Sequence, residues 1–297
     1  MTQRCGFVAV VGAPNAGKST LVNALVGQKV AIVSPKAQTT RTRLMGVAMD
    51  GDTQIVLIDT PGIFAPERRL DRAMVAAAWG SIDNAEAIVL VVDAVAKVGE
   101  RVERLLSGLQ NRKEPLILAL NKVDLAKKDK LLTLAQELSG RANFTEIFFI
   151  SAETGDGVAE LKAHLAGRMP EGTWHFPEDE VSDAPERMLA AEITREQLFR
   201  QLHEELPYQS TVETELFKTR PDGSAEIHQQ IYVARDNQRA IVLGHKGARI
   251  KEIGAKARAE LAELMGRKVH LFLHVKVKAN WDEDRGVYRD MGLDWVD

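Results

Sequence analysis

The first half of the chain alternates short apolar runs with longer amphipathic segments. Five β-rich runs of four to six residues are almost entirely apolar, as expected of strands that helices cover on both faces. They are Phe7–Val11, Ile55–Ile58, Ala87–Val92, Leu116–Leu120 and Ile147–Ile150. Helical patterns lie between them at Lys18–Val26, Val102–Leu109, Leu131–Leu138 and Val158–Leu165. The alternation predicts an α/β domain over residues 1–167, with a mostly parallel sheet flanked by helices.

The pattern changes after residue 167. Residues 168–185 are rich in proline, glycine and acidic residues, and they predict a linker. A second domain with the order α-β-β-α-α-β is expected over residues 186–297. Its expected helices are Arg187–Leu206, Asn237–Leu243 and Ala248–Met265, and its expected strands are Ser210–Thr219, Glu226–Arg235 and Val269–Val277.

The composition limits the number of domains and the cellular compartment that fit this chain. With 297 residues and 45% hydrophobic content, each half can bury a core of its own. The single cysteine, Cys5, excludes an intrachain disulfide and a cysteine zinc site, and it suits a reducing compartment. No apolar run reaches the ~18 residues of a membrane span, and the N-terminal run is too short for a signal peptide. A cytoplasmic protein is expected.

A glycine-rich segment joins the first expected strand to the first expected helix, which is where a phosphate-binding P-loop belongs. Its glycines allow successive backbone N–H groups to surround a β-phosphate. Lys18 would contact the β- and γ-phosphates, and the Ser19 hydroxyl would bind Mg²⁺. The expected nucleotide contacts in this segment are Gly12, Ala13, Pro14, Asn15, Ala16, Gly17, Lys18, Ser19 and Thr20.

Two further segments complete a phosphate and metal site. Asp59 ends the second run and would hold Mg²⁺ through water, and the Gly62 amide would contact the γ-phosphate. Thr40 is favoured over Thr39 as the residue that closes onto Mg²⁺, because the segment resembles the Thr-Arg pair of related GTPases. The expected metal contacts are therefore Ser19, Thr40 and Asp59, and the expected catalytic set is Asn15, Lys18, Thr40, Asp59 and Gly62.

The tetrapeptide that begins at Asn121 ends a buried run, where open α/β sheets bind ligands. It resembles the guanine-recognition motif of GTPases. The resemblance implies that Asp124 accepts hydrogen bonds from guanine, that Asn121 contacts the base edge and the P-loop, and that Lys122 packs along the ring. A companion motif, Ser151, Ala152 and Glu153, resembles the one in which a backbone N–H reads guanine O6. GTP and GDP are the implied ligands.

Ile63 occupies the position where many GTPases carry a glutamine that orients water. Its side chain can neither donate nor accept a hydrogen bond, so slow intrinsic hydrolysis is expected. Asn15 resembles the asparagine with which some GTPases bind K⁺ against the phosphates, an ion that would take the place of an arginine finger. The alternative is that Asn15 only shapes the loop.

A second glycine pair, at Gly244 and Gly247, lies between two expected helices. In the α-β-β-α-α-β order it resembles the GXXG loop of a type II KH domain, which clamps about four nucleotides of single-stranded RNA. Residues 235–278 carry eleven Lys and Arg against four acidic residues, a local charge of +7 in a chain of net charge −3. We expect an apolar groove beside Ile250 and Ile253 to seat the bases. The expected RNA contacts are Gly244, His245, Lys246, Gly247, Arg249, Ile250, Lys251 and Ile253.

These motifs, in this order, resemble the Era family of bacterial GTPases. The resemblance implies an assembly and checkpoint factor for the small ribosomal subunit, whose KH domain binds the 3′-terminal single-stranded end of 16S rRNA under the control of GTP. It also implies peripheral association with the inner membrane, and a monomer is expected. Two alternatives stay open: a GTPase that acts with a tRNA-modification enzyme, and a membrane-associated signalling GTPase whose basic face binds lipid.

Overall fold

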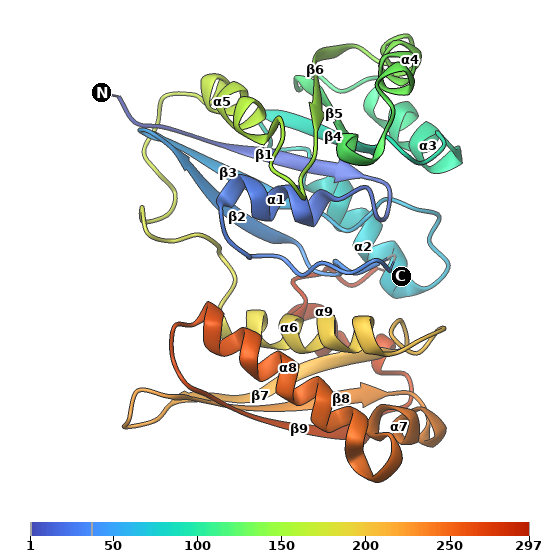
Figure 1. Ribbon diagram of the computed structural model, residues 1–297, viewed down its shortest axis with the longest axis vertical. Helices are drawn as coiled ribbons and strands as arrows, with labels where there is room; N and C mark the ends of the chain where they lie inside the picture. Colours follow the sequence, from blue (N-terminus) through green and yellow to red (C-terminus); the bar gives the residue numbers. More distant parts are fainter. Residues whose placement is uncertain (1, 37, 297) are drawn as a thin grey trace. The chain divides into compact units, whose positions relative to one another are not determined.

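The computed structural model describes residues 2–36 and 38–296, which divide into two compact units (Figure 1). The first unit contains the described residues of Met1–Val33, Thr40–Asp183 and Met291–Asp297. The second contains those of Ser34–Thr39 and Ala184–Asp290. None of the helices in these ranges combines the length and the apolar character needed to cross a lipid bilayer.

The first unit is built on a six-stranded sheet of order β2-β3-β1-β4-β5-β6. Its strands are β1 (Arg4–Gly12), β2 (Leu44–Asp50), β3 (Thr53–Asp59), β4 (Ala87–Asp93), β5 (Leu116–Asn121) and β6 (Phe144–Ile150). Strand β2 runs antiparallel to β3, and all other neighbours pair in parallel. The expected mostly parallel sheet is confirmed.

Helices cover both faces of this sheet (Figure 1). They are α1 (Lys18–Val26), α2 (Arg69–Gly80), α3 (Glu100–Leu109), α4 (Lys128–Ser139) and α5 (Val158–Arg168). Helices α1 and α5 contact each other and the sheet, while side chains of α2, α3 and α4 share a core cluster with β1, β4 and β5. Because parallel strands end at the same edge, Gly12, Asp59 and Asn121 are brought to one side of the unit.

The outer edge of β2 is covered by residues from the segment predicted as a linker. The Val47 N–H donates to the Val181 carbonyl at 2.8 Å, and the Met45 N–H donates to the Asp183 carboxylate at 2.8 Å. Burial raises the pKa of Asp183. This pairing satisfies backbone groups that an edge strand would otherwise leave open.

The second unit carries a three-stranded sheet of order β7-β8-β9, in which β8 is antiparallel to β7 and parallel to β9. Its elements are α6 (Glu186–Gln201), β7 (Ser210–Thr219), β8 (Ala225–Val233), α7 (Asp236–Leu243), α8 (Ala248–Leu264), β9 (Val269–Val277) and α9 (Arg285–Asp290). Side chains of α6, α7 and α8 meet those of β8 in one core. The expected order α-β-β-α-α-β is confirmed, with α9 added.

Helix α6 ends earlier than predicted. The prediction continued to Leu206 because the apolar pattern persists up to Pro207, but Leu202 is extended and Glu204 has a φ of +54°. Leu202 and Leu206 still enter the core, from irregular backbone rather than from a helix. The apolar spacing therefore correctly predicted that Leu202 and Leu206 are buried, but wrongly predicted that they are helical.

Candidate nucleotide site and RNA-binding loop

The loop between β1 and α1 is closely packed against neighbouring backbone. A Cβ atom on Gly12 would lie 2.5 Å from the Val91 carbonyl oxygen. At Gly17, where φ is +93°, a Cβ atom would lie 2.2 Å from Nδ2 of Asn121. No side chain fits at either position. The bare backbone leads directly into the N-terminus of α1, an arrangement that favours a bound phosphate.

Lys18 is buried in this loop. Its Nζ donates to the carbonyl oxygens of Gly12 and Ala13, both at 3.2 Å. Burial lowers the pKa of Lys18 to about 8, against the opposing effect of the nearby Asp59 charge. The two carbonyl oxygens carry only partial negative charge. A bound phosphate would give the Lys18 ammonium a fully charged partner. Thr20, in the first turn of α1, is half-buried.

Three oxygen-bearing side chains converge beside the loop. Ser19 Oγ lies 2.7 Å from Asp59 Oδ2 and 2.8 Å from Thr40 Oγ1, and Thr40 Oγ1 lies 3.4 Å from the same carboxylate oxygen. The hydroxyl of Thr39 instead lies 2.6 Å from Ser34 Oγ and donates to the Lys36 carbonyl. This geometry favours Thr40 over Thr39 as the site threonine.

The chemistry of this cluster fits Mg²⁺. Asp59 Oδ1 is buried without a hydrogen-bond partner among the described residues, so one carboxylate oxygen is left for a cation. Burial raises the pKa of Asp59 to about 6, although the hydrogen bond from Ser19 and the charge of Lys18 both oppose the rise. An all-oxygen set of this kind suits a hard divalent ion. Within the described ranges, no group of three or more His, Cys, Asp or Glu offers another metal site.

The segment after β3 packs against the P-loop. A Cβ atom on Gly62 would lie 2.9 Å from the backbone nitrogen of Pro14, and the Ile63 N–H donates to the Gly12 carbonyl at 3.4 Å. The Ile63 side chain is buried in the core cluster. It is therefore withdrawn from the site as well as apolar.

Asn121 joins three segments of the expected base site. Its Nδ2 donates to the Ala16 carbonyl at 2.8 Å, and its Oδ1 accepts from the Ala152 N–H at 2.9 Å. Since the Ala152 amide is already used, it would have to exchange this partner to read guanine O6. Asp124 and Glu153 are exposed, and Ser151 is buried. The P-loop and the two base motifs are thus held together by one side chain.

Asp93 was not predicted as a site residue from the sequence. It ends β4 beside Asn121 on β5, and its Oδ2 lies 2.6 Å from Lys122 Nζ. The same ammonium donates to the Asn15 carbonyl at 2.9 Å. Asp93 therefore orients the lysine that is expected to pack along the base. An acidic residue at the end of an apolar run was the available signal.

The glycine loop of the second unit adopts positive φ angles, which glycine accepts more readily than other residues. Gly244 and Gly247 have φ values of +72° and +77°, and Lys246 between them has +49°. A Cβ atom on Gly244 would lie 3.0 Å from the Arg249 backbone nitrogen. His245 and Lys246 are exposed, and the loop ends where α8 begins. An exposed lysine, an exposed histidine that can donate hydrogen bonds and a helix N-terminus together make an anion-binding surface.

The residues beyond this loop differ in exposure. Lys251 is exposed, while Arg249 and Ile250 are half-buried. Ile253 departs from the expectation, because its side chain is fully buried in the core of the second unit. It supports α8 from within and cannot line a base-binding groove. Helical spacing places Ile253 on the inner face of α8, which the sequence alone did not distinguish from the edge.

Comparison with known proteins shows which family combines these two sites. Residues 7–122 match the family described as 50S ribosome-binding GTPase, and residues 205–282 match the KH domain. The chain is 62% identical over 297 residues to GTPase Era of Erythrobacter litoralis, covering 99% of this chain and 98% of that protein. It belongs to the Era family of GTPases. GTPase Era of Caulobacter vibrioides is 53% identical over 306 residues, with 98% of this chain and 97% of that protein covered.

Solved Era structures have the same fold along nearly the whole chain. A crystal structure of Era in complex with MgGDPNP and nucleotides 1506–1542 of 16S ribosomal RNA is 38% identical, with a TM-score of 0.92. A variant of Aquifex aeolicus Era bound to GDP·AlF4⁻ gives the same two values. In both comparisons, 98% of this chain and 99% of the other are covered. The GTPase and KH folds are therefore confirmed together.

Proposed function

We propose that this protein binds and hydrolyses GTP as an assembly and checkpoint factor for the small ribosomal subunit. Its KH domain binds the 3′-terminal single-stranded region of 16S rRNA, and the bound nucleotide regulates that binding. The observation that carries the proposal is the Gly244–Gly247 loop at the N-terminus of α8, in which Gly244, Lys246 and Gly247 have positive φ values. The same chain buries Lys18 and Asp59 beside the glycine-rich loop of the first unit. The related Era structure with a 16S rRNA fragment supports the choice of RNA.

The nucleotide is held by three groups of residues. The P-loop backbone and Lys18 bind the phosphates, and the Gly62 amide contacts the γ-phosphate. Ser19, Thr40 and Asp59 hold Mg²⁺, which when bound neutralises phosphate charge. Asp124 accepts from guanine, while Asn121 keeps the base motif against the P-loop.

Binding to RNA can be tested directly with the full chain. We expect a single-stranded oligonucleotide with the 16S rRNA 3′-terminal sequence to bind more tightly than the same sequence paired with its complement. An A-form helix hides the base edges that a KH domain must reach. We also expect the affinity to differ between the GDPNP-bound and GDP-bound protein. Filter binding at fixed ionic strength measures both contrasts.

Equal affinity for the single strand and the duplex would contradict the KH proposal. Vesicles of anionic lipid serve as a third arm of the same experiment. If the protein sediments with these vesicles in low salt and binds neither RNA, the membrane-associated signalling alternative replaces the ribosomal one.

Hydrolysis is proposed to depend on K⁺. Ile63 is apolar and buried, so it cannot orient the attacking water, and Asn15 lies in the P-loop with a φ of +65°. We expect hydrolysis at least about tenfold faster in K⁺ than in Na⁺, equivalent to ~1.4 kcal/mol of transition-state stabilisation. The rate of phosphate release at matched ionic strength gives the comparison.

The variant for this test is Asn15→Gly. Glycine keeps the left-handed backbone and removes only the amide, whereas alanine would add strain. The variant should lose the difference between the two ions while binding GDP as the wild type does. Identical wild-type rates in K⁺ and Na⁺ would remove the ion from the mechanism and leave its role to a protein or RNA partner.

A further inference from the structure

The residues that precede the site threonine belong to a different part of the molecule. The described residues of Ser34–Thr39 group with the second unit, whereas Thr40 groups with the first. Lys36 attaches this segment to the end of α6, because its Nζ donates to the main-chain carbonyl oxygens of Phe199 and Leu202. Carbonyl groups at a helix C-terminus lack partners within the helix and attract a cation. Lys36 therefore acts as a C-terminal cap for α6.

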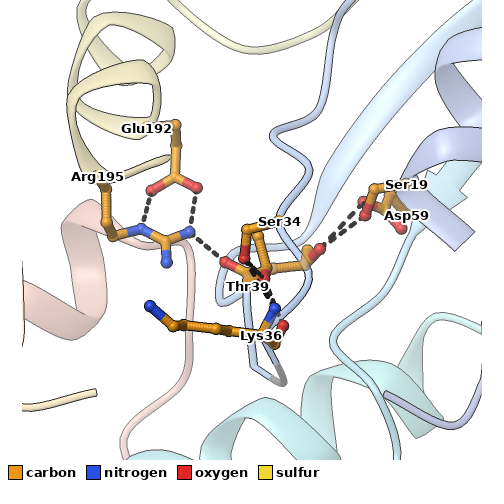
Figure 2. Close-up of polar contacts among 8 residues, drawn as sticks. Ser19, Ser34, Lys36, Thr39, Asp59, Glu192 and Arg195 are labelled. Atoms are coloured by element: carbon orange, nitrogen blue, oxygen red, sulfur yellow. Dashed lines mark hydrogen bonds and ion pairs between the residues drawn. The ribbon is translucent and has the colours of Figure 1, made fainter. Parts of the chain in front are cut away.

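Arg195, in the middle of α6, makes the second attachment (Figure 2). Its Nη2 donates to the main-chain carbonyl oxygen of Thr39. The guanidinium is fixed by Glu192, with Nε 2.8 Å from one carboxylate oxygen and Nη2 2.5 Å from the other. It also lies 5.1 Å from the centre of the Phe199 ring. Paired hydrogen bonds of this kind hold a guanidinium in one orientation.

The burial of Arg195 is unusual for its chemistry. The residue is 1% exposed, and its Nη1 has no hydrogen-bond partner among the described residues. Removing a guanidinium from water costs several kcal/mol, and a buried ion pair often stabilises a fold no better than apolar residues do. A simple structural role therefore explains the choice of arginine poorly. A role that needs a directed donor at the Thr39 carbonyl explains it better.

Thr39 and Thr40 are neighbours in the chain, and their partners differ. The carbonyl of Thr39 is held by Arg195, while the Thr40 hydroxyl contacts Ser19 and lies 3.4 Å from Asp59. Consecutive Cα atoms are about 3.8 Å apart, so fixing Thr39 limits the positions that Thr40 can reach. The attachment of the segment and the position of the site threonine are thus linked through one peptide bond.

We propose that Arg195 is a positioning residue, which holds the Thr39 carbonyl so that Thr40 stays beside Ser19 and Asp59. This inference rests on the proposed GTP site. With GTP bound, Thr40 would contact Mg²⁺ and the γ-phosphate, whereas GDP has no γ-phosphate to contact. Arg195 therefore raises the affinity for GTP selectively over GDP. By linkage, GTP strengthens the attachment of Ser34–Thr39 to α6 by the same factor.

The discriminating measurement is the ratio of two affinities. Arg195→Gln should weaken GDPNP binding by about tenfold in the presence of Mg²⁺ and leave GDP binding unchanged, a coupling of ordinary size for linked sites. Arg267→Gln is the matched control, because Arg267 also pairs with a glutamate of α6, with Nη2 2.8 and 2.6 Å from the two carboxylate oxygens of Glu186. Its GDPNP to GDP ratio should equal that of the wild type.

An unchanged ratio in Arg195→Gln, or an equal loss of both nucleotides, would overturn the proposal. Failure of the wild type to bind GDP would instead contradict the proposed nucleotide site, so the two failures are distinguishable. Retained GDP affinity in the variant also shows that the first unit is folded.

A second measurement needs no variant. Hydrogen exchange of a peptide spanning residues 34–41 should be slower in the GDPNP-bound wild type than in the GDP-bound wild type. Faster exchange in Arg195→Gln with GDPNP, approaching the GDP-bound level, supports the proposal. Equal protection in the two nucleotide states of the wild type would overturn it.

Discussion

Replacing His245 and Lys246 by aspartate is expected to lower the affinity for single-stranded RNA by at least about 100-fold and to leave GTP hydrolysis at the wild-type rate. Both side chains are exposed in the Gly244–Gly247 loop. Two carboxylates would face an RNA phosphate, and the removal of each charge-assisted hydrogen bond costs ~1.5–3 kcal/mol. Aspartate tolerates the left-handed backbone at Lys246, so the loop should keep its shape.

The salt dependence of binding distinguishes the removal of phosphate-binding groups from misfolding of the domain. For the wild type, log affinity should fall linearly with log salt, and the slope of the variant should be shallower by about 0.7 for each phosphate that it no longer neutralises. Lys256→Asp is the control, because Lys256 is exposed on the same helix and pairs with Glu252 at 2.8 Å. It should change the affinity much less. Wild-type RNA affinity in the double variant would refute the assignment of the loop.

Asp124→Asn should change the base preference from guanine toward xanthine. The carboxylate offers two acceptors to the two donors of guanine, and an amide replaces one acceptor by a donor. The loss of one charge-assisted hydrogen bond is worth ~1.5–3 kcal/mol, or about 10- to 150-fold in the dissociation constant of GDP. Binding of GDP and XDP to the same preparations gives the two constants.

The fold should not be affected, because Asp124 is exposed in the short 3-10 helix Val123–Leu125. Asp129→Asn, at an exposed position in the first turn of α4, is the matched control and should bind both nucleotides as the wild type does. If Asp124→Asn binds GDP with wild-type affinity, Asp124 does not read the base.

The elements that could be predicted from the sequence were those with strong local signals. Helix α1 was predicted with its observed bounds, since Gly17 and Gly27 flank it with left-handed backbone. The buried strands β3, β4 and β5 were visible because helices cover both of their faces. Strand β2 was not predicted, because it lies at the sheet edge and contains Gly46. Its conformation depends on pairing with β3 and with residues 181–183, which a local pattern does not report.

In the candidate sites too, contacts between residues close in sequence could be predicted, whereas contacts between distant residues could not. Hydrogen bonds made within a motif, such as those of Lys18 with Gly12 and Ala13, follow from local spacing. Lys36 and Arg195 gave no sequence signal. The Lys36 ammonium donates to two carbonyl groups that lie 163 and 166 residues farther along the chain. Arg195 donates to a carbonyl group 156 residues away in the sequence. A lone basic residue is normally solvated, so only the three-dimensional structure reveals that these two hold a backbone segment.

The covered edge of β2 determines where a stable fragment of the GTPase part can end. A fragment that ends at residue 167 would retain β2 and lack the residues that bond to Met45 and Val47. Its outermost strand would then present open N–H groups in solution, the condition under which sheets recruit strands from other molecules. A fragment that ends after Asp183 keeps that edge closed. Isolated preparations of the GTPase part should therefore extend through the acidic segment instead of stopping at the last helix before it.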